Sequence, residues 1–581
     1  MKIVCLVKQV PRADAIEFDQ ETKQLRREGV PLLLNPFDAA AVAHAAAQKE
    51  RTGAEVIAMT MGPPQAEDAL RTCLALGADR CIHLSDRVFA VADTLGTSRT
   101  LAMAIEKEGG VNLVLCGRKT TDSETWQVPP ETAAFLGWPH LTSVVETELV
   151  GRHIRATRET DRGFETYEVE SPAVVSLAYA RDADGAGEGR IDVWTAADLV
   201  DDLRESDKRF GQPGSPTRVL AVRDVTPERR GEILESVEDA TASVRALLEE
   251  RRVEASSWDK PAHIGEKPGK SYDCWTFVEQ LDGHPARVSL ELIGKGRALA
   301  GKLGGENIAL VLGSDVDSAT REAARHGADR VVVVEDERFA SYHPEVWSYA
   351  LRSVVEQARP HVLLFPATSM GRDLGPRVAG ELELGMTGDC VGLDIARGGR
   401  LLQNKPAYGG NIVSVIMGRT SPQLATVRPR MFDPLQPQDV GPKVERIEVG
   451  ELPEPRARLL DLKVVPAWDL DEADVVVCVG PDVAKLPDLP AGVALGGTRE
   501  VCERGLLPRS RQLGLYGRPV APRLLIAVGV QGDFEQLTGF VKANVIAAIN
   551  ADRQAPMLAA ADLGLVGDWR DLLPPLLSAV S

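Results

Sequence analysis

A short glycine-containing run near the C-terminal end of the chain has the composition needed to bind a phosphate group. The run Gly529-Val530-Gln531-Gly532 directly follows the apolar segment Leu524–Val528, which is a predicted buried strand. Glycine lets backbone N–H groups approach a phosphate closely, and the start of a following helix adds positive potential. Any tight strand-to-helix turn has the same spacing, so the prediction depends on this strand–turn–helix context.

The other residues that could take part in chemistry do not form the patterns of metal, disulfide or catalytic sites. The eight cysteines form no C-x-x-C pair, so the sequence predicts no zinc or iron–sulfur site and no disulfide framework. No nucleophile, base and orienting group recur at a catalytic spacing, and we predict no catalytic residues. The net charge of −18 argues against a nucleic-acid scaffold.

Targeting signals are also missing from the sequence pattern. The apolar run within Met1–Pro11 is too short for a signal peptide. No stretch reaches the ~18–20 apolar residues that span a bilayer. We therefore expect a cytoplasmic protein without a transmembrane segment.

The elements that must position these residues alternate between short apolar runs and alanine-rich helical stretches. Apolar runs bounded by glycine or proline and followed by helices are typical of parallel strands covered on both faces. The fold class is therefore α/β, with several doubly wound units. The runs are Lys2–Val7, Glu55–Thr60, Val111–Cys116, Ile308–Leu312, Arg330–Glu335, His361–Phe365, Asp474–Val479 and Leu524–Val528.

The chain also contains an internal repeat. Residues 71–80 are echoed by residues 321–330, and residues 111–137 by residues 360–385, at nearly the same offset. We predict two related α/β domains, at residues 1–255 and 271–440, and a third domain at residues 458–581. Residues 256–270 and 441–457 are rich in loop-forming residues and are predicted linkers, the second of them a hinge or a rigid spacer. The helical stretch Pro227–Arg252 either wraps a neighbouring domain or is a solvated connection.

Motifs along nearly the whole chain resemble those of electron transfer flavoproteins. The first half resembles the beta subunit, on Lys8–Pro11, Asn35–Asp38, Met61–Pro63, Asp122–Val128, Val193–Thr195 and Gly214–Thr217. The second half resembles the alpha subunit, on Gly371–Arg377, Thr387–Cys390, Lys405–Asn411, Gln423–Pro429, Gln512–Gly514, Ala527–Gly529, Ala548–Asp552 and Ala555-Pro556. The resemblance therefore implies a fusion of two subunits that are usually separate chains, ending in a Rossmann-like FAD-binding domain.

The resemblance also implies binding residues. For FAD these are Arg499, Gln512, Gly514, Tyr516, Gly517, Gly529, Gln531, Gly532, Gln536, Asn550 and Asp568. For a second nucleotide, either AMP or a second FAD, they are Asn35, Asp38, Gly62, Asp122, Thr125, Gln127 and Val128. Asn550 and Asp568 would otherwise be structural caps, and Trp126 would either stack on an adenine or fill the site.

Two departures fall on residues that the family places near the flavin. Tyr516 stands where the family has a threonine, and Gln536 stands where it has a histidine. A neutral amide offers no full positive charge to a reduced flavin, and Asp533 and Glu535 add negative charge nearby. We expect a flavin that is harder to reduce than is usual in the family.

The implied function is an electron carrier that takes electrons from a flavin dehydrogenase and passes them to a membrane-associated or soluble acceptor such as a quinone reductase. The loop of residues 180–190 has no lysine run, which puts the family's usual acyl-CoA dehydrogenase partner, and hence fatty acid oxidation, in doubt. Two alternatives stay open. One is an electron-bifurcating protein with two FADs, and the other is a nucleotide-binding regulatory protein that has lost flavin chemistry.

Overall fold

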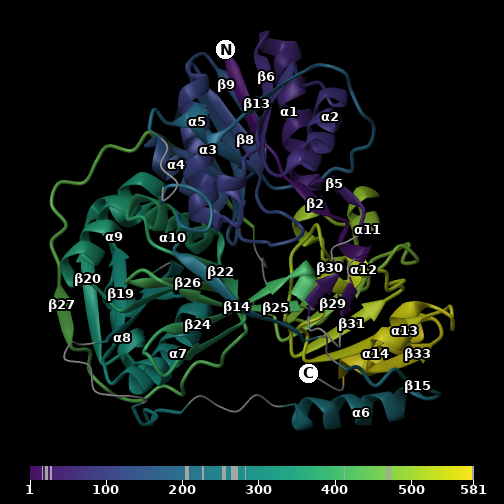
Figure 1. Ribbon diagram of the computed structural model, residues 1–581. Helices are drawn as coiled ribbons and strands as arrows, with labels where there is room; N and C mark the ends of the chain where they lie inside the picture. Colours follow the sequence, from purple (N-terminus) through teal and green to yellow (C-terminus); the bar gives the residue numbers. More distant parts are fainter. Residues whose placement is uncertain are drawn as a thin grey trace. The chain divides into compact units, whose positions relative to one another are not determined.

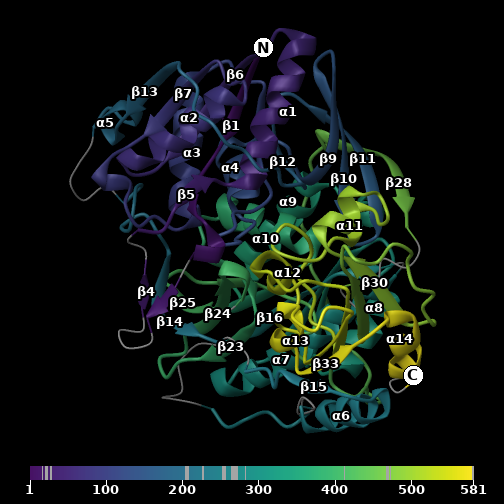
Figure 2. The same ribbon diagram turned by 90° about the vertical axis from the view of Figure 1, so that its right-hand side faces the viewer.

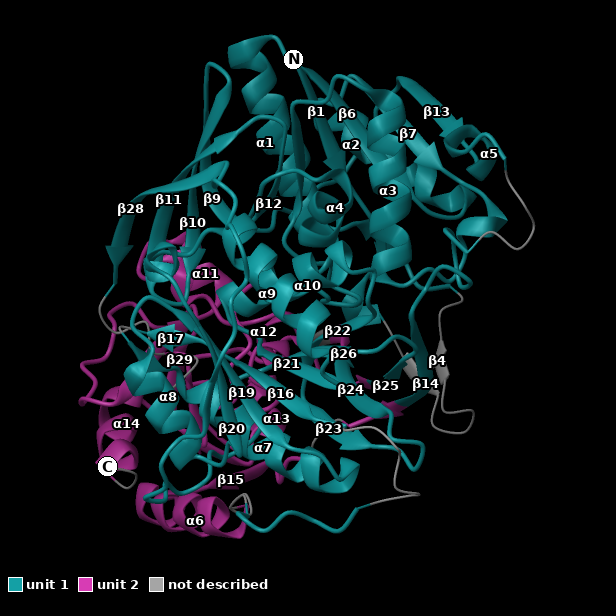
Figure 3. Ribbon diagram, turned by 90° about the vertical axis from the view of Figure 1, so that its left-hand side faces the viewer, with its two compact units in different colours: residues 1–222, 256–406, 414–465 teal, residues 223–255, 407–413, 466–581 magenta. Residues whose placement is uncertain are grey.

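The structure is a computed structural model of the chain (Figure 1). It describes residues 1–578 apart from residues 16, 20–23, 27–28, 203–207, 226–227, 252–256, 264–271, 282, 411, 466–469 and 471–472, and apart from the side chains of residues 17–19, 24–26 and 409. The predicted linker 256–270 therefore lies mostly outside the described residues. The chain forms two compact units, coloured separately in Figure 3. The first contains residues 1–222, 256–406 and 414–465, and the second contains residues 223–255, 407–413 and 466–581.

The first half of the chain builds a ten-stranded sheet of order β13-β7-β6-β1-β8-β12-β9-β10-β11-β28. The strands from β13 to β9 in this order are parallel to one another. Beyond β9, the strands β10, β11 and β28 each pair antiparallel with the strand before them. The parallel strands are β1 (Lys2–Leu6), β6 (Glu55–Met61), β7 (Arg80–Leu84), β8 (Leu113–Gly117), β9 (His140–Val150), β12 (Ala173–Leu177) and β13 (Arg190–Trp194). The others are β10 (His153–Thr160), β11 (Gly163–Glu170) and β28 (Ala457–Val464).

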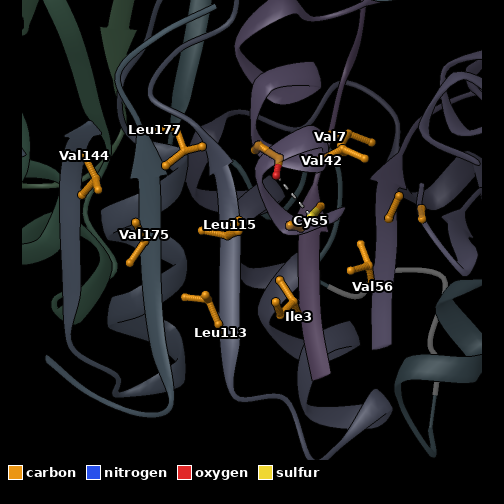
Figure 4. Packing of buried hydrophobic residues seen from close by; sticks show 14 of the residues in the cluster. Ile3, Cys5, Val7, Val42, Val56, Leu113, Leu115, Val144, Val175 and Leu177 are labelled. Carbon is orange, nitrogen blue, oxygen red and sulfur yellow. Dashed lines mark hydrogen bonds between the residues drawn. The ribbon is translucent and has the colours of Figure 1, made fainter. Parts of the chain in front are cut away.

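Helices cover both faces of this sheet (Figure 2). On one face α1 (Pro36–Thr52) and α2 (Glu67–Ala75) pack on alternate strand residues. Figure 4 shows Ile3, Cys5, Leu113, Leu115 and Val175 in that layer. On the other face lie α3 (Thr94–Glu108), α4 (Val128–Leu136) and α5 (Ala196–Leu199). Continuous burial along β8 and β12 explains why their sequences show no polar alternation.

The second half repeats this plan in a fully parallel sheet of order β22-β26-β21-β16-β19-β20-β27. Helices α9 and α10 pack on one face and α7 and α8 on the other. The strands are β16 (Cys274–Val278), β19 (Asn307–Gly313), β20 (Arg330–Glu335), β21 (Val362–Pro366), β22 (Met386–Cys390), β26 (Gln423–Val427) and β27 (Val444–Arg446). The helices are α7 (Arg287–Leu303), α8 (Asp317–Arg325), α9 (Pro344–Ala358) and α10 (Ser369–Glu381).

The structure confirms the predicted repeat. Helices α2 and α8 begin 250 residues apart, at Glu67 and Asp317, as do α3 and α9, at Thr94 and Pro344. Gly77 and Gly327 occupy the same turn with φ of +112° and +107°, a region that favours glycine. Both halves are doubly wound, so the predicted α/β fold class is confirmed. The antiparallel extension β10, β11 and β28 on the first sheet was not predicted.

The third sheet has the order β15-β33-β32-β31-β29-β30, and all its strands are parallel. Its strands are β29 (Val475–Val479), β30 (Val493–Gly497), β31 (Leu524–Val528), β32 (Val545–Asn550) and β33 (Leu563–Val566), with β15 (Glu232–Leu234) at the edge. Helices α6 (Val237–Glu250), α11 (Arg499–Glu503) and α14 (Trp569–Ser578) cover one face. The other face packs against α13 (Pro556–Ala560) and the segments around α12 (Phe534–Thr538).

Helix α6 and strand β15 come from the stretch predicted as a helix over Pro227–Arg252. Ala240, Val244 and Leu247 of α6 are buried in the core of the third sheet, beside β33 and α14 (Figure 1). Of the two predictions for this stretch, a helix packed on a domain and a solvated connection, the structure shows the first. In the predicted linker 441–457, Val449 and Leu452 are buried in the core of the second sheet. A fourth sheet has the order β14-β25-β24-β23, with β14 (Thr217–Asp224), β23 (Gly392–Ile395), β24 (Leu401–Ala407) and β25 (Ile412–Gly418).

Candidate functional site

The third sheet has a topological switch point between β29 and β31. The chain runs from β29 outward to β30 and then returns to the other side of β29 to build β31, β32 and β33. In open parallel sheets, ligands bind beyond the carboxyl ends of the strands at the point where the winding reverses. Here those ends are followed by Gly480 and Gly529.

The backbones after β29 and β31 come so close that only glycine fits. A Cβ atom on Gly480 would lie 1.9 Å from the carbonyl oxygen of Gly529. Gly529 and Gly532 have φ of +62° and +88°, and a Cβ atom on Gly532 would lie 2.5 Å from the backbone nitrogen of Met557. Within the described residues, the backbone N–H groups of Val530 and Gln531 have no acceptor. The switch point therefore presents backbone donors that suit an anionic group.

The loop of residues 512–518 lies between the end of β30 and helix α12. The backbone N–H of Leu513 donates to Gly497 (2.8 Å), and that of Leu515 donates to Glu535 (2.8 Å). Gly514 has φ of +115°, and a Cβ atom on Gly517 would lie 2.2 Å from the carbonyl oxygen of Gln512. The predicted residues Gln512, Gly514, Tyr516 and Gly517 thus sit at the same edge of the sheet as Gly529.

Arg499 begins α11 at the end of β30 and lies against Tyr516. Its guanidinium carbon is 5.2 Å from the centroid of the Tyr516 ring, and its Nε donates to Glu503 (2.8 Å). The tyrosine that replaces the family's threonine therefore contacts the cation predicted to lie beside the flavin. This contact holds the arginine near the switch-point edge through a cation–π interaction.

The remaining predicted residues hold loops through their side chains. The side-chain oxygen of Gln536 accepts a hydrogen bond from the Gly532 N–H (2.8 Å), and the Asn550 amide donates to the Val530 carbonyl (3.0 Å). Asp568 accepts from the Arg570 N–H at the start of α14 (2.9 Å), and this bond lowers its pKa. Gln531 donates to Asp482 across the switch point (2.8 Å).

Sequence reasoning missed three residues at this edge: Gly480, Asp482 and Thr498. Thr498 is buried, and its hydroxyl has no partner among the described residues. Gly480 and Thr498 directly follow buried apolar runs, and Asp482 is two residues further on. Because the carboxyl ends of parallel strands meet at one edge of a sheet, the location of these residues just after predicted strands could have marked them as site residues. The strand order that brings them together is not readable from local sequence.

The first-half residues predicted for a second nucleotide gather at the equivalent switch point, between β1 and β8. Asn35 is buried, donates to the Lys119 carbonyl (3.0 Å) and accepts from the Thr121 N–H (3.3 Å). Asp38 accepts from the backbone N–H groups of Lys8 and Gly117, each at 2.9 Å. These two side chains therefore join the loop after β1 to the loop after β8.

Burial changes the protonation of the acidic groups here. Burial raises the pKa of Asp38 to about 7, although its hydrogen bonds act in the opposite direction. Burial would also raise the pKa of Asp122, but the Lys8 ammonium at 2.6 Å lowers it overall. Asp122 therefore stays ionised and paired with Lys8 in the loop that follows β8.

The other predicted residues of this group lie along the same loop or one strand away. Gln127 is buried and donates to the Met386 carbonyl of the second repeat (3.0 Å). The Thr125 carbonyl oxygen would be 2.5 Å from a Cβ atom on Gly388, and Val128 is the first residue of α4. Gly62 follows β6, and its carbonyl lies 3.2 Å from His83 Nε2. The loop of residues 118–128 is thus packed against the second repeat.

Comparison with known proteins agrees with this arrangement. The electron transfer flavoprotein domain family matches the chain twice, at residues 22–199 and 274–452. The electron transfer flavoprotein FAD-binding domain matches residues 469–541. The two matches to the first family cover more than half of the chain. The chain belongs to the electron transfer flavoprotein family.

Individual relatives agree with the family assignment. The electron transfer flavoprotein subunit alpha of Clostridium acetobutylicum is 36% identical over 323 residues, which are 53% of this chain and 96% of that protein. Protein FixB of Azorhizobium caulinodans is 38% identical over 52% of this chain and 87% of that protein. The lactate dehydrogenase (NAD(+),ferredoxin) subunit LctC of Acetobacterium woodii is 32% identical over 52% of this chain and 76% of that protein.

As an electron transfer flavoprotein, the chain carries electrons, and FAD is the cofactor of its C-terminal domain. The residues present fit that group. The matched segment 469–541 contains the switch-point glycines, the N–H groups of Val530 and Gln531, and the buried Thr498 hydroxyl that has no partner among the described residues. Every helix in the described part of the chain is too short or too polar to traverse a bilayer. The same residues include no cluster of three or more histidine, cysteine or acidic side chains placed to hold a metal ion.

Proposed function

We propose that FAD binds at the switch point between β29 and β31, and that the chain passes electrons from a flavin dehydrogenase to an acceptor such as a quinone reductase. The observation that carries this proposal is the glycine pair Gly480 and Gly529, next to backbone N–H groups without acceptors in the described chain. This arrangement lies inside the segment that matches the FAD-binding domain. Bound FAD supplies the electron-accepting chemistry.

The chain's own residues would bind and orient that cofactor. The N–H groups of Val530 and Gln531 are placed to receive phosphate oxygens. Arg499, held against Tyr516, provides a positive charge that favours an electron-rich ring system. Gln536 supports the phosphate loop through Gly532 and brings no cation. This supports the expectation of a flavin that is harder to reduce than is usual in the family.

We also propose that the chain fuses a beta-like half to an alpha-like half. The two matches to one domain family and the shared strand order of the first two sheets support it. Relatives named as alpha subunits match about half of this chain. A fusion would keep the two halves at a fixed ratio and at high effective concentration. The domain ranges 1–255, 271–440 and 458–581 remain our proposal for its organisation, except that β15 and α6 belong to the third sheet, β28 belongs to the first, and Val449 and Leu452 of the proposed linker 441–457 pack into the core of the second.

A second candidate is an electron-bifurcating carrier with another FAD in the first half instead of AMP. The similarity to LctC, named as part of an NAD(+)- and ferredoxin-dependent lactate dehydrogenase, favours it. The third candidate is a nucleotide-binding regulatory protein without flavin chemistry, which the replacements at Tyr516 and Gln536 favour. Each of the three candidates predicts a different set of bound nucleotides.

The test is the visible absorption spectrum of the purified full-length protein, followed by acid release and chromatography of what it holds. One FAD per chain, with or without AMP, is the expected result for a simple carrier. Two FADs per chain would support bifurcation. A colourless protein that does not take up added FAD would overturn the electron-carrier proposal in favour of the regulatory one.

A further inference from the structure

The loop of residues 529–532 is held in place through its carbonyl oxygens. The Asn550 amide donates to the carbonyl of Val530 (3.0 Å), and the backbone N–H of Met557 donates to the carbonyl of Gln531 (3.0 Å). The N–H groups of Val530 and Gln531 themselves have no acceptor in the described part of the chain. The loop therefore presents two fixed donors beyond the carboxyl end of β31.

The third N–H group of this loop is already used by the protein. Gly532 donates to the side-chain oxygen of Gln536 (2.8 Å). Among the described residues, no lysine, arginine or histidine side chain forms a hydrogen bond to residues 529–532. A phosphate at this loop is thus met by neutral backbone donors, without a cation bonded to the same loop.

The charged side chain that is bonded to this loop is instead a carboxylate. Asp482, in the segment after β29, accepts a hydrogen bond from the side-chain amide of Gln531 (2.8 Å). A Cβ atom added to Gly529 would lie 3.3 Å from the Cβ of Asp482, so the two segments are in contact here. The amide that holds the carboxylate is neutral and does not cancel its charge.

Other charged groups close to this position are engaged elsewhere. Within the described residues no basic side chain pairs with Asp482. Arg504 reaches the neighbouring residue, where its guanidinium donates to the Pro481 carbonyl (2.7 Å). Asp533, at the other end of the loop, caps α12 by accepting from the Gln536 N–H (2.9 Å). Asp482 is therefore a negative charge held beside the two donors of the phosphate loop.

We propose that Asp482 is a specificity residue of the FAD site, and that its charge favours the pyrophosphate of FAD over a terminal phosphate such as that of FMN. Each phosphorus of a pyrophosphate diester carries about one negative charge, whereas a terminal phosphate carries about −1.5 to −2 at pH 7. Repulsion from a fixed carboxylate grows with the charge of the ligand. Specificity is commonly set by such an unfavourable contact with the wrong ligand. This inference rests on the proposed function, because it requires a flavin nucleotide at the switch point.

The test is fluorescence titration of the full-length protein, freed of bound flavin, with FAD, FMN and riboflavin. Asp482→Asn keeps the shape of the side chain and removes its charge. We expect the ratio of FAD affinity to FMN affinity to fall about tenfold in this variant, because FMN gains more affinity than FAD does. Riboflavin has no phosphate, and its affinity should equal that for the wild type.

Two further variants separate the effect of charge from an effect on structure. Asp482→Glu keeps the charge with a different side-chain length, and it should keep a ratio close to that of the wild type. Asp488→Asn removes the same charge from an exposed position later in the same segment. Its ratio should also match the wild type, because Asp488 makes no contact with the loop in the described chain.

Each contrary outcome has a distinct meaning. A ratio that Asp482→Asn leaves unchanged, in a protein that binds FAD, would overturn this inference alone. A change in riboflavin affinity as large as the change for FMN would also overturn it, because the effect would then not act on the phosphate. Wild-type protein that takes up no flavin would overturn the proposed function and this inference together.

Discussion

At the scale of single residues, the backbones of Gly480 and Gly529 in the candidate FAD site leave no room for a side chain on Gly480. Gly480 and Gly529 belong to strands that are neighbours in space but separated by about 50 residues of chain. A methyl group on Gly480 would overlap the Gly529 carbonyl at 1.9 Å, a contact that a rigid sheet edge cannot relieve cheaply. The two loops that present the backbone donors would have to separate.

We therefore expect Gly480→Ala to weaken FAD binding by roughly tenfold or more, since misplaced donors lose their hydrogen bonds to the ligand. Flavin fluorescence during titration of FAD into the apoprotein measures this directly. Gly398→Ala is the control, because no atom lies within 4 Å of its added methyl group. Equal affinity in the two variants would contradict the role given to the switch point.

Asp38 gives a prediction that depends on pH. Burial raises its pKa from 3.8 to about 7 in the folded protein. Between these values the folded chain keeps a proton that the unfolded chain has released, so the contribution of Asp38 to stability falls as pH rises. The slope is at most ~1.4 kcal/mol per pH unit, and the contribution is constant above the folded pKa.

Asp38→Asn removes this titration, so we expect the variant to be penalised more, relative to wild type, near pH 5 than near pH 8. Urea unfolding of both proteins at the two pH values gives the comparison. Asn also loses one of the two acceptors for the Lys8 and Gly117 N–H groups, which adds a penalty common to both conditions. A penalty that does not change with pH would refute the raised pKa.

The sequence predicted Gly529 and Gly532 because strand, turn and helix follow one another along the chain. It did not predict Gly480, Asp482 or Thr498, because their proximity to those glycines depends on the order of strands in the sheet. The side chains of Asn35, Asp38 and Gln127 were predicted to contact a nucleotide. Each is hydrogen-bonded within the protein, and its contact with a nucleotide stays a prediction.

At the scale of elements, strand β15 and helix α6 belong to the second unit although they precede the second repeat in the chain. Leu247 is fully buried among residues of the third sheet, whereas Ala246 on the same helix is exposed. The apolar spacing of the stretch predicted a helix but not which domain it covers. The antiparallel strands β10, β11 and β28 were likewise missed, because β28 comes from a distant part of the sequence.

Leu247→Ala should destabilise the second unit by about 2–5 kcal/mol, the usual cost of deleting a buried leucine side chain. FAD retention should fall with it, since the phosphate loop is built on the same sheet. Thermal unfolding followed by flavin fluorescence would report both effects. Ala246→Ser on the exposed side of α6 should change neither. Wild-type stability and FAD retention in Leu247→Ala would show that α6 does not support the sheet.

At the scale of the whole molecule, the two repeats and the third sheet each have a doubly wound order but use their switch points differently. At the switch point of the first sheet, side chains join the loops that follow β1 and β8. These side chains are Asn35, Asp38 and the ion pair of Lys8 with Asp122. At the third, glycines and backbone donors remain available in the described chain. The fold alone therefore does not distinguish the proposed FAD site from the other switch point, and the residues at the carboxyl ends of the strands do.

Because the two units have separate cores, we expect calorimetry to show two transitions with different ligand responses. A ligand at a hundredfold excess over its dissociation constant stabilises its own unit by about 2.7 kcal/mol. FAD should shift the transition of the second unit and leave that of the first unit unchanged. In Gly480→Ala the same FAD concentration should shift the transition of the second unit only about half as much, because tenfold weaker binding lowers the stabilisation to about 1.4 kcal/mol. A single transition that FAD shifts as a whole would show that the two units do not unfold independently.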